Sequence, residues 1–333
     1  MKTTPLARFL LLALIGLAFA GGASAQVPSV GLSTVRSQRF HNENLLGFYT
    51  PQEGDQFGFA VAAGDFNGDG IDDLATGIPF DDGLTDSPIV DSGSVVVRFG
   101  VAGEGLSSNL AGTVLRQVPF MNPPEAKDRL GEALAACDFN GDGFDDLAIS
   151  VDHEDHVDRD NAGAVQVHYG SSVLGINFNP EDFYAQSSPG IPGVADDGQF
   201  FGATLACGDF NADGFADLVA SAPRYWIKLN PLRIGTAGMI VVTPGSAFGL
   251  DHHRSLGLDQ DSEGVDGDAE DDLFGFGLGV GDFNGDGFDD LAVGSPAEDD
   301  SKGAIHVFFG GSFGVTVENS LFWMETFIGG SSE

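Results

Sequence analysis

The residues most able to do chemistry lie in an acidic turn that occurs four times, as in "GDFNGDGFDDLAVG" at residues 281–294. Counted from the first aspartate, positions 1, 3, 5 and 9 carry side-chain oxygen, and position 7 offers its backbone carbonyl. Several oxygen ligands that converge on one point suit Ca²⁺, which takes about six to eight at about 2.3–2.6 Å. The predicted ligands are Asp65, Asn67, Asp69, Ile71, Asp73, Asp138, Asn140, Asp142, Phe144, Asp146, Asp209, Asn211, Asp213, Phe215, Asp217, Asp282, Asn284, Asp286, Phe288 and Asp290.

Other interpretations of the turn fit the residues less well. An EF-hand needs a glutamate at position 12 and flanking helices, whereas position 12 is Thr76, Ile149, Ala220 or Val293 and the flanks are strand-like. Zinc would favour His or Cys, which the turn lacks, and magnesium a smaller octahedral site. Simple hairpin turns also favour Asp, Asn and Gly, but four copies with the same oxygen positions favour calcium, about four ions in all.

The spacing of the turns indicates a repeat architecture, because the leading aspartates are 73, 71 and 73 residues apart. Each unit contains four short runs rich in Val, Ile and Phe, bounded by Gly, Asp and Pro, and no sustained helical period. Four strands in a repeated unit are typical of β-propeller blades, so we expect an all-β fold. The expected blades span about residues 53–124, 125–195, 196–268 and 269–333.

The ends and the composition predict an exported protein with few kinds of partner. Residues 1–25 have a basic start, an apolar run too short to span a bilayer and a cleavage-like "ASA", so we expect a signal peptide cleaved near Ala25. No other run is long enough to cross a membrane. With 50 acidic residues against 14 basic ones, the chain is a poor partner for nucleic acid or an anionic membrane.

The repeated residues resemble FG-GAP repeats, the blades of the integrin α-subunit propeller. The pair "FG" stands at 57–58, 201–202 and 274–275, and G/S-x-P stands at 77–79, 221–223 and 294–296, with the acidic turn between them. The second unit departs from the pattern, with Leu130 for Phe and "SVD" for the GAP element. The resemblance covers about residues 53–325 and implies a calcium-binding propeller.

The number of blades stays open at this point. Propellers of the family commonly have seven blades, and this chain has four units. Residues 26–52 include "STVRSQRFHNENL" at 33–45, which resembles a spare fourth strand. We therefore expect a truncated array or a fragment of a longer propeller, with a four-bladed ring as the alternative.

Three further features have competing interpretations. Cys137 and Cys207 are one residue apart in repeat phase and would face opposite sides of a strand, so two buried small residues are favoured over a disulfide. In "DHEDHVDRD" at 152–160, the residues His153, His156 and Asp158 could bind a transition metal, but a solvated acidic loop is favoured. The G-x-S-x-G string at 310–314 aligns with turns of other units, which argues against a hydrolase nucleophile.

A basic and aromatic loop is the candidate recognition surface. "PRYWIKLNPLR" at 223–233 contains Arg224, Tyr225, Trp226, Lys228 and Arg233, and the resemblance implies that it lies on the ligand-engaging face opposite the calcium turns. Such residues dominate binding hot spots; packing of Trp226 between blades is the equal alternative. The predicted function is a secreted, non-catalytic propeller for adhesion or for binding a protein or carbohydrate ligand. The alternatives are a carbohydrate- or matrix-binding module of a larger secreted hydrolase and a purely structural spacer.

Overall fold

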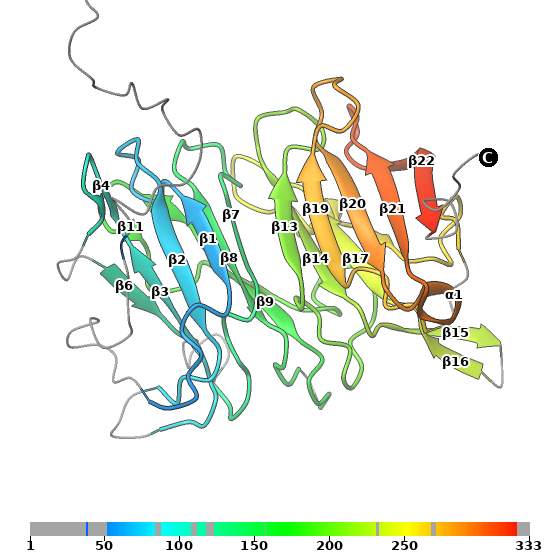
Figure 1. Ribbon diagram of the computed structural model, residues 1–333, viewed down its shortest axis with the longest axis horizontal. Coiled ribbons are helices and arrows are strands. Elements are labelled where there is room, and N and C mark those ends of the chain that lie inside the picture. Colours follow the sequence, from blue (N-terminus) through cyan, green and yellow to red (C-terminus); the bar gives the residue numbers. More distant parts are fainter. Residues whose placement is uncertain are drawn as a thin grey trace, which may run out of the picture. The chain divides into compact units, whose positions relative to one another are not determined.

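Four antiparallel sheets of four strands each form the framework of the computed structural model (Figure 1). The structure describes residues 38, 52–83, 88–107, 112–117, 123–156, 158–230, 233–267 and 271–324. The expected signal peptide at 1–25 and the spare strand at 33–45, apart from Gln38, lie outside the described residues. All four sheets belong to one compact unit, Phe40–Glu333.

Each sheet is assembled from four strands of one repeat. The first contains β1 (Val61–Gly64), β2 (Asp73–Ile78), β3 (Ser94–Arg98) and β6 (Gly112–Leu115). The second contains β7 (Leu134–Cys137), β8 (Asp146–Val151), β9 (Ala164–His168) and β12 (Asp182–Tyr184). The third contains β13 (Leu205–Gly208), β14 (Asp217–Ala222), β17 (Met239–Thr243) and β18 (Leu256–Leu258). The fourth contains β19 (Gly277–Gly281), β20 (Asp290–Ser295), β21 (Ala304–Phe309) and β22 (Thr316–Met324).

Short elements connect these strands. Two-residue strands follow the third strand in the first two repeats, and a longer hairpin precedes it in the third. They are β4 (Gly100–Val101) with β5 (Gly105–Leu106), β10 (Gly170–Ser171) with β11 (Gly175–Ile176), and β15 (Trp226–Asn230) with β16 (Arg233–Thr236). A 3₁₀ turn at His252–Arg254 and the short helix α1 (Glu298–Ser301) complete the described elements.

The acidic turn fixes the register between the first two strands of every sheet. In the first sheet Gly64 pairs with Asp73 and Val61 with Thr76, so the turn is the hairpin between β1 and β2. In the third and fourth sheets the residues at these positions also pair, Gly208 with Asp217 and Gly281 with Asp290. The central strands are buried on both faces, which explains their continuous apolar runs.

Most of the hydrophobic core lies between consecutive sheets, and a smaller cluster of Ile78 and Val96 lies on the first sheet alone. One cluster joins the first two repeats around Phe66 and Leu130, a second joins the next two around Phe139 and Phe201, and a third joins the last two around Phe210 and Phe274. The first strands β1, β7, β13 and β19 also contact one another in that order. This stacking of twisted four-stranded sheets is the blade packing of a β-propeller, as predicted.

A disulfide links the second and third blades. Cys137, the last residue of β7, is bonded to Cys207 of β13, with 6.4 Å between their Cα atoms. The expectation of two unpaired, buried cysteines is therefore wrong. The expectation rested on which side of a strand each residue faces, whereas the two strands belong to different blades whose contact brings both side chains together.

Candidate metal centres

The four acidic turns adopt the same conformation. In each, the position-6 glycine has a positive φ, between 82° at Gly70 and 93° at Gly287, which only glycine adopts without strain. The backbone N–H groups of positions 5 and 6 donate to the two oxygens of the position-1 carboxylate. In the first turn, Asp69 N lies 3.1 Å from Asp65 Oδ1 and Gly70 N lies 2.7 Å from Asp65 Oδ2. The turns beginning at Asp138, Asp209 and Asp282 repeat both contacts.

The amide oxygen at position 3 is held beside the position-1 carboxylate. Asp69 N donates to Asn67 Oδ1 at 2.9 Å as well as to Asp65 Oδ1, so one N–H group is shared by two oxygens. Asn140, Asn211 and Asn284 accept the equivalent bond at 2.8 Å. An oxygen that accepts one hydrogen bond keeps a second lone pair, so these oxygens remain able to ligate a cation.

The position-9 aspartate fixes the turn through two hydrogen bonds from backbone N–H groups. Asp73 is buried and accepts from Phe66 N at 3.1 Å and from Gly100 N at 2.8 Å, which ties the turn to the start of β4. Asp146, Asp217 and Asp290 make the equivalent pair of contacts. Burial raises the pKa of Asp73 to about 6, of Asp217 to about 7 and of Asp146 to about 8.

The donor set of each turn fits a hard cation. Each turn gathers carboxylates at positions 1, 5 and 9 and an amide at position 3 within nine residues. Among the described residues, no arginine, lysine or histidine forms an ion pair with any of these carboxylates. Their mutual repulsion therefore has no basic side chain to offset it, whereas a bound divalent ion would offset it.

A cluster of two acidic residues and one histidine forms next to the second sheet, but it does not contain His156 or Asp158. Oxygen and nitrogen atoms of Glu132, Asp152 and His153 lie within 4.8 Å of one another. Arg129 Nη1 lies 3.2 Å from His153 Nε2 and 3.4 Å from Glu132 Oε1, so a guanidinium already supplies positive charge there. His156 and Asp158 are not part of this cluster. Sequence spacing could not reveal it, because Glu132 and Asp152 precede and follow different strands.

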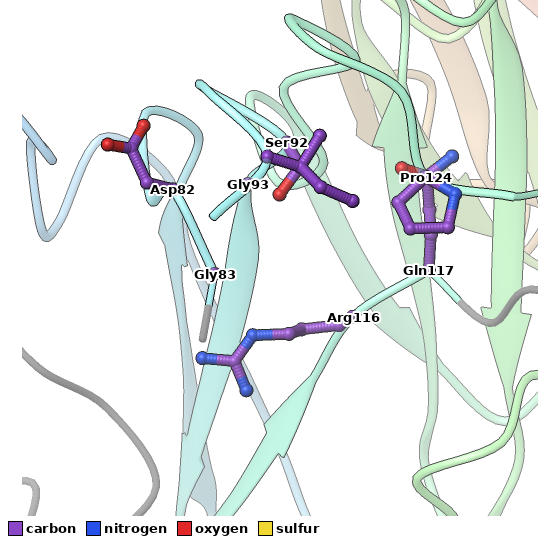
Figure 2. Close-up of a pocket in the computed structure, with 8 residues that line it drawn as sticks. Asp82, Gly83, Ser92, Gly93, Arg116, Gln117 and Pro124 are labelled. Carbon is purple, nitrogen blue, oxygen red and sulfur yellow. The ribbon is translucent and has the colours of Figure 1, made fainter. Parts of the chain in front are cut away.

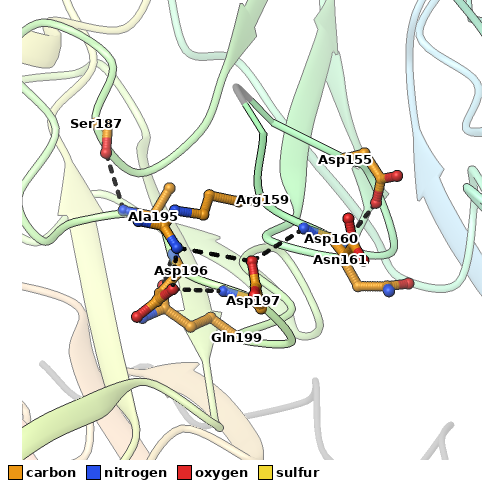
Figure 3. Close-up of polar contacts among 9 residues, drawn as sticks. All are labelled: Asp155, Arg159, Asp160, Asn161, Ser187, Ala195, Asp196, Asp197 and Gln199. Carbon is orange, nitrogen blue, oxygen red and sulfur yellow. Dashed lines mark hydrogen bonds and ion pairs between the residues drawn. The ribbon is translucent and has the colours of Figure 1, made fainter.

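The rest of the acidic loop at 152–160 connects blades. Arg159 Nη1 donates to Asp196 Oδ1 at 2.9 Å and Asp160 N donates to Asp197 Oδ1 at 3.2 Å, which ties this loop to the segment that leads into the third blade (Figure 3). Asn161 N donates to Asp155 Oδ1 at 2.7 Å within the loop. These contacts agree with a structural use of the acidic loop.

The predicted recognition loop forms the hairpin β15–β16. Trp226 is 43% exposed, and the Arg224 guanidinium lies 5.1 Å from the centre of the Phe200 ring. Tyr225 is half-buried against the core between the second and third blades. The side chains of Lys228 and Arg233 lie outside the described part of the structure. The hairpin thus presents its tryptophan to solvent instead of packing it fully between blades.

A cavity that sequence reasoning did not reveal lies beside the first blade. It has a volume of about 180 Å³ and is lined by residues that include Asp82, Ser92, Arg116 and Gln117 (Figure 2). Arg116 Nη2 forms an ion pair with the buried Asp81 at 3.2 Å. These residues come from separate loops, so no local sequence motif predicts the cavity.

No helix in the described part of the chain has the length and apolarity needed to cross a membrane.

Comparison with known proteins identifies the repeats. The family model described as FG-GAP repeat matches residues 57–97, 130–168, 201–225 and 274–308. Integrin alpha pat-2 of Caenorhabditis briggsae is 28% identical over 72% of this chain and 18% of its own length, and integrin alpha-5 of Xenopus laevis is 28% identical over 72% and 20%. Phosphatidylinositol-glycan-specific phospholipase D of Bos taurus is 30% identical over 55% of this chain and 21% of its own. The chain thus spans about a fifth of the length of these curated relatives.

Among solved structures, a rhamnogalacturonan lyase of Bacillus licheniformis aligns with a TM-score of 0.40 and 13% identity, covering 70% of this chain and 39% of the lyase. A second, the rhamnogalacturonan lyase YesW, aligns with a TM-score of 0.39 and 14% identity. A likeness at this level carries no conclusion about function.

Proposed function

From the premise that this chain is an FG-GAP repeat protein similar to integrin α chains, we propose that it is a secreted calcium-binding propeller that engages an extracellular ligand without catalysis. The observation that supports the proposal most is the backbone hydrogen-bond pattern that the four acidic turns share. In each turn one backbone N–H group donates to side-chain oxygens at positions 1 and 3. The carboxylate at position 9 accepts a backbone hydrogen bond from position 2.

Calcium would act as a structural clamp between strands. The predicted ligands at positions 1, 3, 5, 7 and 9 span the hairpin from the first strand to the second, so an ion held by them would fix the hairpin on which the next blade packs. A ligand that binds only the folded state stabilises it, by about 2.7 kcal/mol when its concentration is a hundred times Kd. Four such sites would make the fold strongly dependent on calcium.

An extracellular setting is supported by the disulfide. Cys137 and Cys207 are bonded, and structural disulfides persist mainly in oxidising compartments. The expected signal peptide at residues 1–25 agrees with export.

The recognition surface we propose is the β15–β16 hairpin. It combines a half-exposed tryptophan with an exposed arginine on a protein of net charge −36, where such groups are rare. Aromatic and arginine side chains supply most hot-spot energy at interfaces. A matrix glycoprotein array, probed with and without calcium, would test the function directly. Binding that needs calcium and that is lost on Trp226→Ala supports it, and calcium-independent or absent binding contradicts it.

The alternative is a carbohydrate- or matrix-binding module of a larger secreted hydrolase. The 30% identity to a phospholipase D over 55% of this chain supports this alternative. A glycan array separates the two proposals, because a carbohydrate module should bind sugars in the absence of any protein partner.

A further inference from the structure

The residue at position 8 of the second acidic turn reaches into the first turn. This residue, Asp145, stands between the predicted ligands Phe144 and Asp146. Its carboxylate accepts from Asp65 N at 2.8 Å, and its own N–H donates to Asp65 O at 3.1 Å. Asp65 is the position-1 ligand predicted for the first turn. One residue of the second turn therefore holds a ligand residue of the first turn by both of its backbone groups.

The third and fourth turns are joined in the same way. Asp289 Oδ2 accepts from Asp209 N at 2.9 Å, and Asp289 N donates to Asp209 O at 3.3 Å. In both joints a glycine before the earlier turn leaves room for the carboxylate. A Cβ built on Gly64 would lie 2.9 Å from the Cβ of Asp145, and one built on Gly208 would lie 2.8 Å from Asp289 Oδ2. Two positions, a glycine and an aspartate, thus specify the joint.

The second and third turns lack this carboxylate. Position 8 of the third turn is Ala216, whose N–H donates to Asp138 O at 2.9 Å but whose side chain cannot accept from Asp138 N. The residue before the second turn is Cys137 instead of glycine, and it is bonded to Cys207 of β13. The disulfide joins the two blades whether or not an ion is bound, and it reaches a strand instead of the ligand positions of the third turn.

Two further contacts are common to the first two junctions. In both, the position-2 carbonyl of the earlier turn accepts a hydrogen bond from the following blade. The ring of Phe144 covers Gly68 of the first turn so closely that this glycine has no room for a Cβ. The ring of Phe215 covers Gly141 of the second turn in the same way. The two junctions therefore differ in the carboxylate and the disulfide, and their turns are otherwise joined alike.

We propose that the first and second calcium sites bind their ions cooperatively, as do the third and fourth, and that the second and third sites are coupled less. This coupling rests on the calcium binding proposed above. An ion held by positions 7 and 9 of the second turn would fix Asp145, which lies between them and orients Asp65. The next ion then has less conformational freedom to remove when it binds to the first turn, so its affinity rises. By linkage the effect is the same in either order of binding.

Charge acts against this coupling. An ion on one turn offsets part of the negative charge that attracts an ion to the neighbouring turn. At about 0.15 M salt, interactions between exposed charges are screened over about 8 Å. The hydrogen bonds between the turns are short-range contacts and persist at that ionic strength. Titrations in 0.15 M salt therefore report mainly on the joint between the turns.

Two variants of the full chain isolate neighbouring pairs of sites. Asp213→Ala with Asp286→Ala leaves the first and second sites, and Asp69→Ala with Asp286→Ala leaves the second and third. Each calcium-free variant is titrated with Ca²⁺ in a calorimeter. In the first variant the second ion should bind at least about fivefold tighter than the first after statistical correction, which is the lower end of typical coupling, and in the second variant less than about twofold tighter.

Substitutions of Asp145 in the first of these variants separate the joint from its charge. Asp145→Ala should lower the coupling to that of the second and third sites, because Ala216 stands at the equivalent position. Asp145→Asn removes the same charge but keeps an oxygen that can accept from Asp65 N, so it should retain most of the coupling. Equal losses in Asp145→Ala and Asp145→Asn would assign the effect to charge and overturn the proposal.

Melting curves show whether the two-site variants are folded at the temperature of the titration. If one is not, the same two substitutions are made in the wild type. There Asp145→Ala should leave the number of bound ions unchanged and make the binding curve less steep, and Asp145→Asn should do neither. Independent binding at the first and second sites, or equal coupling in both two-site variants, overturns the proposal while calcium binding stands. A chain that binds no calcium overturns both.

Discussion

The Asp145 carboxylate accepts a hydrogen bond from the backbone N–H of Asp65 at 2.8 Å, although the two residues are 80 positions apart. Asp145 belongs to the acidic turn of the second blade, and Asp65 opens the turn of the first. Asp145 N in turn donates to Asp65 O at 3.1 Å. The turns that we propose as calcium sites are therefore also joints between blades, so binding of an ion and packing of neighbouring blades are coupled.

Loss of this joint should be measurable in the free energy of unfolding. Asp145→Ala leaves Asp65 N–H without its carboxylate partner, and we expect a loss of about 1 kcal/mol. The substitution is sterically mild, since the third blade has Ala216 at the same position. Urea denaturation in dilute solution measures the effect. Asp72→Ala is the matched control, because this exposed equivalent in the first blade should cost less than about 0.5 kcal/mol; equal losses would contradict the assignment.

The disulfide between the second and third blades should stabilise the fold. It closes a loop over a sequence separation of 70 residues, and removal of such a bridge typically costs about 2–5 kcal/mol. The double variant Cys137→Ala with Cys207→Ala should therefore unfold at lower denaturant concentration than the wild type. Reducing agent should destabilise the wild type by a similar amount and leave the double variant unchanged. A wild type indifferent to reductant would show that the cysteines are not paired in solution.

Acidification should weaken the fold through His168. Burial lowers the pKa of this fully buried residue from 6.5 to about 4. Its Nδ1 contacts Asn177 O at 2.7 Å and its Nε2 contacts Gln166 Nε2 at 2.6 Å, so the neutral ring is fully paired. Because the unfolded chain takes up the proton first, the His168 contribution is complete above about pH 6.5 and is lost as the pH falls toward 4.

The contribution amounts to at most about 3 kcal/mol, since one pKa unit corresponds to about 1.4 kcal/mol. His168→Thr, which introduces the residue that the third blade has at Thr243, should reduce the difference in unfolding free energy between pH 7 and pH 4.5. The buried aspartates and glutamates titrate in the same way in the wild type and in His168→Thr, so their contributions to the unfolding free energy cancel in the comparison. An unchanged pH difference in the variant would show that His168 is accessible to protons in the folded state.

The β15–β16 hairpin should tolerate changes that abolish recognition. Because Trp226 is 43% exposed, Trp226→Ala should change the free energy of unfolding by less than about 0.5 kcal/mol. Calorimetric melting measures this directly. A loss of several kcal/mol would instead assign Trp226 to packing between blades and remove the hairpin as a candidate binding surface.

The sequence was sufficient to predict the blades, because their determinants are local. The acidic turn, the apolar–glycine pair and the short apolar runs recur at nearly constant spacing, and each specifies a hairpin or a strand without reference to distant residues. The family and the propeller fold are confirmed. The calcium ligands, the blade boundaries and the signal peptide remain predictions.

Features that depend on contacts between segments far apart in the sequence could not be predicted in the same way. The pairing of Cys137 with Cys207 was missed because strand alternation describes one sheet, whereas the bond crosses two. Glu132, Asp152 and His153 meet because two loops of one blade converge. The half-exposed Phe283 has the same sequence context as the buried Phe66, but Phe66 is covered by the second blade and no described blade covers Phe283.

Isothermal titration of the calcium-free full chain with Ca²⁺ tests the central claim most directly. We predict about four ions per chain, matching the four acidic turns, and a melting temperature that rises with Ca²⁺ much more than with Mg²⁺. Asp286→Ala should remove one ion, while Asp300→Ala, which changes an exposed acid outside the turns, should remove none. A chain that binds no calcium, and that melts at the same temperature with calcium as with a chelator, would show that the acidic turns are hairpins and nothing more.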